Sequence, residues 1–178
     1  MRKFFLGLAT AILASGSAQA ALKVGSKAPD FVTTGALAGK PFRLHLAEQL
    51  RKGPVVLYFY PKAFTKGCTL EAHAFSEAAV DFKKAGASII GMSADDLPTL
   101  QRFSTEECRN AFPVATATRP IIKAYDVGMP VVNNVTTMTN RTSYVIARDG
   151  RVTMVHSDLN WSEHVQKTLA AVRSLKGR

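Results

Sequence analysis

The feature that most constrains the fold is an unbroken apolar run at residues 55–60, Val-Val-Leu-Tyr-Phe-Tyr. The run is rich in β-branched and aromatic residues and lies between Pro54 and Pro61, which mark its ends. A strand that is apolar at every position is typical of a sheet covered on both faces. The run therefore predicts a buried central strand in a layered α/β domain.

The patterns on either side of this strand alternate between helix and strand. Phe75, Ala79 and Phe82 recur at helical spacing and predict an amphipathic helix over residues 69–84. The further expected elements are short strands within 24–46, a strand at 87–93, a helix at 98–110, strands at 142–147 and 152–156 with an Asp-Gly hairpin signal between them, and a closing helix along Trp161, Val165, Leu169 and Val172. This order indicates a thioredoxin-like fold, an α/β domain with a mixed central sheet flanked by helices.

The first twenty residues have the pattern of a secretory signal peptide. Arg2 and Lys3 form a basic start, residues 4–13 form an apolar run, and Ala18-Gln19-Ala20 is the small-x-small pattern of a cleavage site. The apolar run is too short for a membrane anchor, although an uncleaved membrane helix is the alternative interpretation. We expect a signal peptide at 1–20, one domain at 21–178, and no stable membrane insertion.

Composition and charge narrow the classes of function. Of the 178 residues, 47% are hydrophobic and 20% charged, which is a globular composition and sufficient for one domain. The formal charge of +10 falls to +8 when Arg2 and Lys3 are removed. Because the lysines and arginines are scattered rather than clustered, a basic soluble surface is favoured over nucleic-acid binding.

Two cysteines, Cys68 and Cys108, lie in the expected domain. An even pair in an exported protein is consistent with a structural disulfide. A working thiol is the alternative, and in an oxidising compartment it needs a dedicated reductant. A Cys-x-x-Cys motif is absent and the four histidines lack metal-ligand spacing, so no metal or other cofactor is expected.

The stretch from Pro61 to Cys68 is where the sequence points to chemistry. It joins the central strand to the following helix, which places Cys68 at the first turn, where the helix stabilises the reactive thiolate form. Gly67 allows a close backbone approach, and Thr65 carries a hydroxyl three residues before the sulfur. Pro61 can cover the site without presenting a competing N–H.

Four motifs resemble one family. The pattern Pro-x-x-x-Thr-x-x-Cys, formed by Pro61, Thr65 and Cys68, resembles the signature of the peroxiredoxins. The flanking residues resemble the bacterioferritin comigratory protein (peroxiredoxin Q) branch: Tyr58-Phe59-Tyr60-Pro61-Lys62 and Gly67-Cys68-Thr69 around the cysteine, Ala28-Pro29-Asp30-Phe31 near the start, and Asn140-Arg141-Thr142-Ser143-Tyr144-Val145-Ile146 in the strand of the active-site arginine.

The resemblance implies a thiol peroxidase without a cofactor. Arg141 is expected beside the Cys68 sulfur, where it stabilises the thiolate and orients the peroxide. Donors from the Thr65 hydroxyl, Arg141 and the Cys68 backbone N–H are expected to bind the peroxide oxygens. Cys68 would attack the distal oxygen of hydrogen peroxide or an organic hydroperoxide, and would become a sulfenic acid.

The second cysteine allows two interpretations. Some relatives carry a resolving cysteine in the second helix, where Cys108 is predicted, and the resemblance therefore implies an intramolecular disulfide as the next step. A buried or permanently bridged Cys108 is the alternative. Other relatives carry a second cysteine five residues after the first, a position held here by His73, which we expect at the surface or the edge of the core.

The resemblance also implies a thioredoxin-like or other dithiol reductant, a monomer and a periplasmic location. Two other functions stay open at this point. One is a periplasmic thioredoxin-like thiol–disulfide oxidoreductase, against which the missing Cys-x-x-Cys counts. The other is a non-enzymatic domain with a structural Cys68–Cys108 disulfide.

Overall fold

The central strand is buried on both faces, as the apolar run predicts. In this computed structural model, which describes residues 21–129 and 138–175, β3 (Val55–Phe59) has no exposed side chain. Val56 and Tyr58 pack into one hydrophobic cluster, whereas Leu57 and Phe59 pack into another on the opposite face. Residues 1–20, the predicted signal peptide, lie outside the described residues.

Seven strands form one mixed sheet in the order β2-β1-β5-β4-β3-β6-β7. They are β1 (Val32–Leu37), β2 (Lys40–His45), β3, β4 (Ser88–Ser93), β5 (Val114–Thr116), β6 (Thr142–Ile146) and β7 (Val152–Ser157). The strands β3, β4 and β5 are parallel, and all other pairs are antiparallel. The predicted mixed sheet is thereby confirmed.

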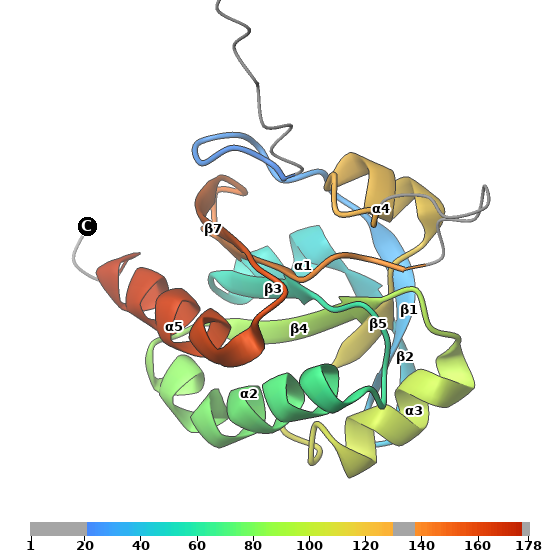
Figure 1. Cartoon of the computed structure of the whole chain (residues 1–178). Helices are drawn as coiled ribbons and strands as arrows, with labels where there is room; N and C mark the ends of the chain where they lie inside the picture. Colours follow the sequence, from blue (N-terminus) through green and yellow to red (C-terminus); the bar gives the residue numbers. More distant parts are fainter. Residues whose placement is uncertain (1–20, 130–137, 176–178) are drawn as a thin grey trace, which may run out of the picture.

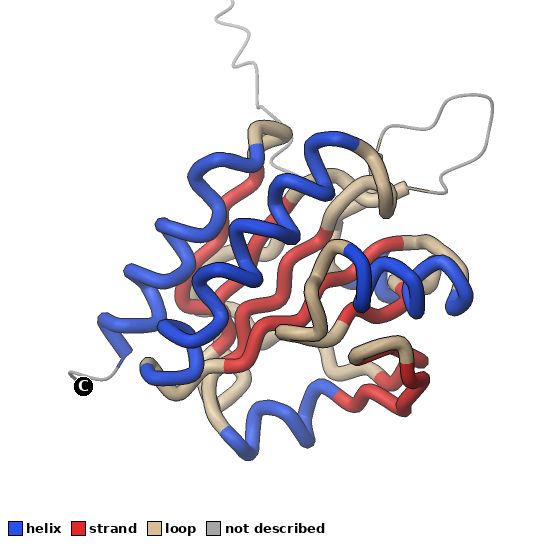
Figure 2. Tube along the Cα trace, turned by 90° about the horizontal axis from the view of Figure 1, so that it is seen from below, coloured by secondary structure: helices blue, strands red, loops and turns tan. Residues whose placement is uncertain are grey.

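Helices cover both faces of this sheet (Figure 1). They are α1 (Leu46–Lys52), α2 (Lys66–Lys84), α3 (Leu97–Glu106), α4 (Arg119–Ala124) and α5 (His164–Leu175), with a 3₁₀ turn η1 (Trp161–Glu163) before the last. The clusters of buried side chains place α2, α3 and α5 on the face of Tyr58 and place α1 and α4 on the other. Seen from below, α2 and α5 run side by side (Figure 2). In residues 21–129 and 138–175, no helix combines the length and apolarity that crossing a bilayer requires.

Two helix boundaries differ from the sequence prediction, and both concern cysteines. The helix α2 begins at Lys66 rather than at residue 69, so that Cys68 lies inside its first turn. The helix α3 ends at Glu106 rather than at Asn110. It ends there because Arg109 and Asn110 both have left-handed backbone conformations, with φ of 49° and 61°. Cys108 is therefore in the turn after α3, not in the helix.

Candidate active site

Cys68 is the third residue of α2 and lies almost entirely out of solvent, with 2% of its surface exposed. The chain reaches it from the end of β3 through a loop that closes at Thr65, the N-cap of the helix. The first turn of a helix has backbone N–H groups without intrahelical partners and carries the positive end of the helix dipole. An anion at this sulfur is therefore favoured.

The Arg141 guanidinium reaches the same sulfur. Arg141 directly precedes β6, the neighbour of β3, and its Nη2 donates to Cys68 Sγ at 3.5 Å. Its Nε donates to the Leu159 carbonyl at 2.9 Å, which fixes the plane of the side chain. A Cβ at Gly67 would lie 3.3 Å from Nη2, so the missing side chain of Gly67 leaves room for the guanidinium. The sequence prediction that Cys68 and Arg141 meet agrees with this geometry.

Thr65 and Pro61 belong to the loop before the helix. Pro61 is half-buried and follows Tyr60, whereas Thr65 is exposed. The Thr65 hydroxyl donates to the Lys62 carbonyl at 2.9 Å. Its proton is thus engaged, and the oxygen is left to accept a hydrogen bond. The expectation that Thr65 helps to bind the peroxide stays a prediction.

Phe64 ties this loop to α3. It has a left-handed backbone conformation, with φ of 63°, which costs a residue with a bulky side chain about 1–2 kcal/mol. Its ring packs edge-on against Phe103 at 5.3 Å and lies 5.0 Å from the Arg102 guanidinium. The loop is therefore held in a strained conformation by contacts with α3.

Glu71 is a site residue that sequence reasoning missed. A glutamate in an amphipathic helix is ordinarily expected on the polar face, yet Glu71 is fully buried and its Oε2 accepts a hydrogen bond from Arg141 Nη1. Burial raises the pKa of Glu71 to about 8, against the opposing effect of the Arg141 charge. Its position three residues after Cys68, on the same helix face, is the signal that identifies it in retrospect.

A buried histidine lies behind Glu71. The Nε2 atom of His164 is 2.9 Å from the Asp158 carbonyl, which can only accept, so Nε2 carries the proton. The Nδ1 atom therefore accepts from the Ser143 hydroxyl at 2.8 Å and lies 3.7 Å from Glu71 Oε1. Burial lowers the pKa of His164 to about 4. His164 is thus neutral at physiological pH.

Acidification should weaken the fold through His164. Because its pKa falls from 6.5 to about 4 on folding, below pH 6.5 the unfolded chain binds a proton that the folded state excludes. Stability present above pH 6.5 is lost as the pH falls towards about 4, by up to about 3 kcal/mol. Urea unfolding at neutral pH and near pH 4 should show a larger loss for the wild type than for His164→Gln. Equal losses would contradict this assignment.

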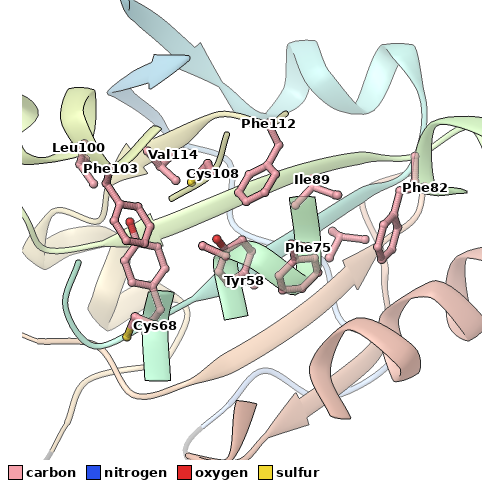
Figure 3. Close-up of a cluster of buried hydrophobic side chains, with 14 of the residues drawn as sticks. Tyr58, Cys68, Phe75, Phe82, Ile89, Leu100, Phe103, Cys108, Phe112 and Val114 are labelled. Carbon is pink, nitrogen blue, oxygen red and sulfur yellow. The ribbon is translucent and has the colours of Figure 1, made fainter. Parts of the chain in front are cut away.

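Cys108 and Cys68 both have free thiols in one hydrophobic cluster. Figure 3 shows the two sulfur atoms well separated there, so the structure lacks the structural disulfide of the non-enzymatic alternative. Cys108 is fully buried, and burial raises the pKa of its thiol well above the usual range. In this conformation Cys108 is a protonated core residue.

Three side-chain contacts hold the Cys108 turn against α2. The Ser76 hydroxyl donates to the Cys108 carbonyl at 2.7 Å, and His73 Nε2 lies 2.7 Å from Glu107 Oε2. Arg109 Nη1 donates to Glu77 Oε1 at 3.3 Å. His73 is half-buried at the edge of the core, as expected from the sequence. Within the described part of the chain, no group of three or more His, Cys, Asp or Glu side chains could hold a metal.

Fold and site together define a class of protein. A cysteine at a strand-to-helix junction of a mixed sheet, with a buried arginine on its sulfur and no cysteine three residues away, suits thiol chemistry with a small oxidant.

The comparisons name that class. A sequence model of the AhpC/TSA family matches residues 24–155. A putative peroxiredoxin of Mycobacterium tuberculosis is 32% identical over 87% of this chain and 99% of its own length. The chloroplastic peroxiredoxin Q of Sedum lineare is 31% identical over 94% of this chain and 87% of its own. The crystal structure of peroxidoxin BcpB from Mycobacterium tuberculosis superposes with a TM-score of 0.75 and 32% identity, over 86% of this chain and 98% of that one.

The chain therefore belongs to the AhpC/TSA family. Within it, the chain is a peroxiredoxin similar to the peroxiredoxin Q branch, with the predicted thioredoxin-like fold, and it is a thiol-dependent peroxidase. The thiol–disulfide oxidoreductase alternative is not favoured. Peroxiredoxins reduce peroxides at the expense of thioredoxin-like reductants.

Proposed function

We propose that Cys68 is the peroxidatic cysteine of this enzyme and that it reduces hydrogen peroxide, organic hydroperoxides or both. The observation that carries the assignment is the 3.5 Å contact between Arg141 Nη2 and Cys68 Sγ at the first turn of α2. A thiolate needs opposite charge and oriented donors, and both are present at this sulfur. Cys108, by contrast, is fully buried, and burial raises the pKa of its thiol well above the usual range.

The proposed reaction assigns one role to each of these groups. The Cys68 thiolate attacks the distal peroxide oxygen; an S–O bond forms as the O–O bond breaks. Arg141 and the Cys68 backbone N–H stabilise the charge that develops on the peroxide oxygens. Thr65, whose hydroxyl proton is engaged with Lys62, accepts the peroxide O–H and thereby orients the substrate. Cys68 becomes a sulfenic acid, and water or an alcohol leaves after taking up a proton.

The variant Thr65→Val tests the orienting role. It removes the acceptor oxygen while it keeps the β-branched shape, so turnover should fall by about 10-fold or more. The pH dependence of Cys68 alkylation should stay in place, because Arg141 is untouched. Ser162→Val, whose hydroxyl belongs to an exposed residue of η1, is the matched control. An alkylation profile that moves as far in Thr65→Val as in an Arg141 variant would contradict this division of roles.

We also propose that Cys108 resolves the sulfenic acid as a disulfide within one chain. Bridging requires the two Cα atoms to come within about 7 Å, so the Cys68 loop and the Cys108 turn have to open. The left-handed backbone conformations of Phe64 in the loop and of Arg109 and Asn110 in the turn are strained, and this strain favours a local opening. Because both segments are attached to α3, loosening of this helix releases both.

Thiol titration before and after one equivalent of peroxide tests both proposals together. The reduced wild type should have two titratable thiols after denaturation and none after peroxide. The Cys108→Ser variant should lose its single thiol and keep a sulfenic acid, or oxidise further. Mass spectrometry should find the Cys68–Cys108 disulfide in the wild type alone. Sustained turnover of Cys108→Ser with a dithiol protein reductant would instead indicate an enzyme that works with one cysteine.

The proposal also covers the reductant, the oligomeric state and the location of the enzyme. A thioredoxin-like or other dithiol protein reduces the disulfide. The enzyme works as a monomer. It is exported to the periplasm after cleavage near Ala21, a proposal supported by the signal-peptide pattern of residues 1–20 and by a family match that starts at residue 24.

A further inference from the structure

Glu71 and Cys68 contact the same guanidinium from two sides. Arg141 donates to Cys68 Sγ through Nη2 and to Glu71 Oε2 through Nη1. All three side chains are buried, at 5% exposure or less. The guanidinium remains protonated at any physiological pH, so the site contains one permanent positive charge.

One positive charge cannot balance two buried anions. If Cys68 and Glu71 were both ionised, the site would hold an uncompensated negative charge, which is costly away from water. If both were protonated, Arg141 would be the unpaired charge. The neutral arrangements have either a thiolate with a protonated carboxyl or a thiol with a carboxylate. Cys68 and Glu71 are therefore coupled through Arg141.

The second carboxyl oxygen indicates where the proton resides. Glu71 Oε1 is buried and has no hydrogen-bond partner. Its polar neighbour is His164 Nδ1 at 3.7 Å, a lone pair that already accepts from Ser143. Because Ser143 takes the single lone pair of Nδ1, Oε1 has neither a donor nor a free acceptor there, and an unpaired neutral carboxyl costs less to bury than an unpaired carboxylate. Tyr58 of β3 interacts electrostatically with Glu71, and burial keeps its hydroxyl neutral.

We propose that Glu71 holds a proton while Cys68 is a thiolate, and that it releases this proton when Cys68 loses its negative charge to the peroxide. The inference rests on the proposed role of Cys68 as the nucleophile. In the reaction the S–O bond forms, the O–O bond breaks, and the departing hydroxide or alkoxide takes up one proton. Glu71 gives up one proton in the same step and becomes the partner of Arg141. The charge of the buried site stays at zero throughout.

Proton counting during alkylation separates this proposal from a merely structural Glu71. Iodoacetamide converts a thiolate into a neutral thioether and by itself releases no proton. We expect the wild type at neutral pH, in weak buffer with a pH indicator, to release about one proton for each thiolate consumed. The thiolate itself is followed by its ultraviolet absorbance. Glu71→Gln, which keeps an acceptor for Arg141, should lose the same absorbance and release none.

A matched control and a second readout complete the test. Glu77→Gln removes an exposed carboxylate from the same helix and should release the proton as the wild type does. Infrared difference spectra of the wild type should show the carbonyl band of a protonated carboxyl disappear on alkylation. Thiolate consumption without proton release and without this band would overturn the inference and leave the proposed function intact. A wild type without Cys68 thiolate absorbance would overturn both.

Discussion

Replacement of Cys68 by serine is expected to lower peroxidase turnover to below about 1% of the wild-type value, because the hydroxyl group has no accessible anion at neutral pH. Sulfur and oxygen differ little in size, so the fold should be kept. Peroxide consumption with a dithiol reductant measures the loss, and circular dichroism with urea unfolding checks the structure.

The matched control for this variant is Cys108→Ser. Both substitutions exchange one buried thiol for a hydroxyl, and both cysteines belong to the same cluster. Only Cys108→Ser should consume the first equivalent of peroxide at the wild-type rate. If Cys68→Ser keeps more than a few per cent of turnover, the nucleophile is another group and the site has been misassigned.

Replacement of Arg141 by alanine is also expected to cause a large loss of peroxidase activity. In the proposed reaction, this variant removes the charge that stabilises the thiolate and a donor to the peroxide oxygens. Loss of one oriented donor alone lowers turnover about 100-fold or more, so kcat/KM for peroxide should fall at least that far. Alkylation of Cys68 should require a higher pH than in the wild type, because the thiolate has lost its partner.

Two further arginine variants make the result specific. Arg141→Lys keeps a positive charge but loses the fork that binds Cys68 and Glu71 together, so its activity should be intermediate. Arg151→Ala removes an exposed arginine paired with Asp149 at the surface and should behave as the wild type. An unchanged pH profile of alkylation in Arg141→Ala would refute its stabilising role.

The sequence predicts the layers of the fold well, because its strongest patterns come from buried surfaces. The run at residues 55–60 became β3 and the stripe with Phe75 and Phe82 became α2, each within a few residues. The short elements α1, β5 and α4 were not predicted. At three to seven residues they are too short to show a period, and packing rather than local preference forms them.

The sequence predicts those site residues that belong to a recognisable motif. It does not predict residues whose role depends on their burial in the folded structure. The Pro-x-x-x-Thr-x-x-Cys pattern predicts Pro61, Thr65 and Cys68 as site residues, and the separate motif at residues 140–146 predicts Arg141. A glutamate within an amphipathic helix is ordinarily assigned to solvent, but Glu71 lies four residues before Phe75 on the buried face of α2, where it pairs with Arg141. The tautomer of His164 likewise depends on a carbonyl and a hydroxyl from other segments of the chain, and its neutral state depends on burial.

The pairing of β3 with β6 brings Cys68 and Arg141 close together in space although they are far apart in the sequence. Cys68 and Arg141 are 73 residues apart in sequence, but Phe59, at the end of β3, lies opposite Thr142, the residue after Arg141. Insertions or deletions between β4 and β6 leave this short path unchanged. A slip of β6 by one residue against β3 would turn Arg141 towards the opposite face of the sheet. Strand registration therefore determines whether the enzyme has an active site at all, whereas the length of the intervening chain does not.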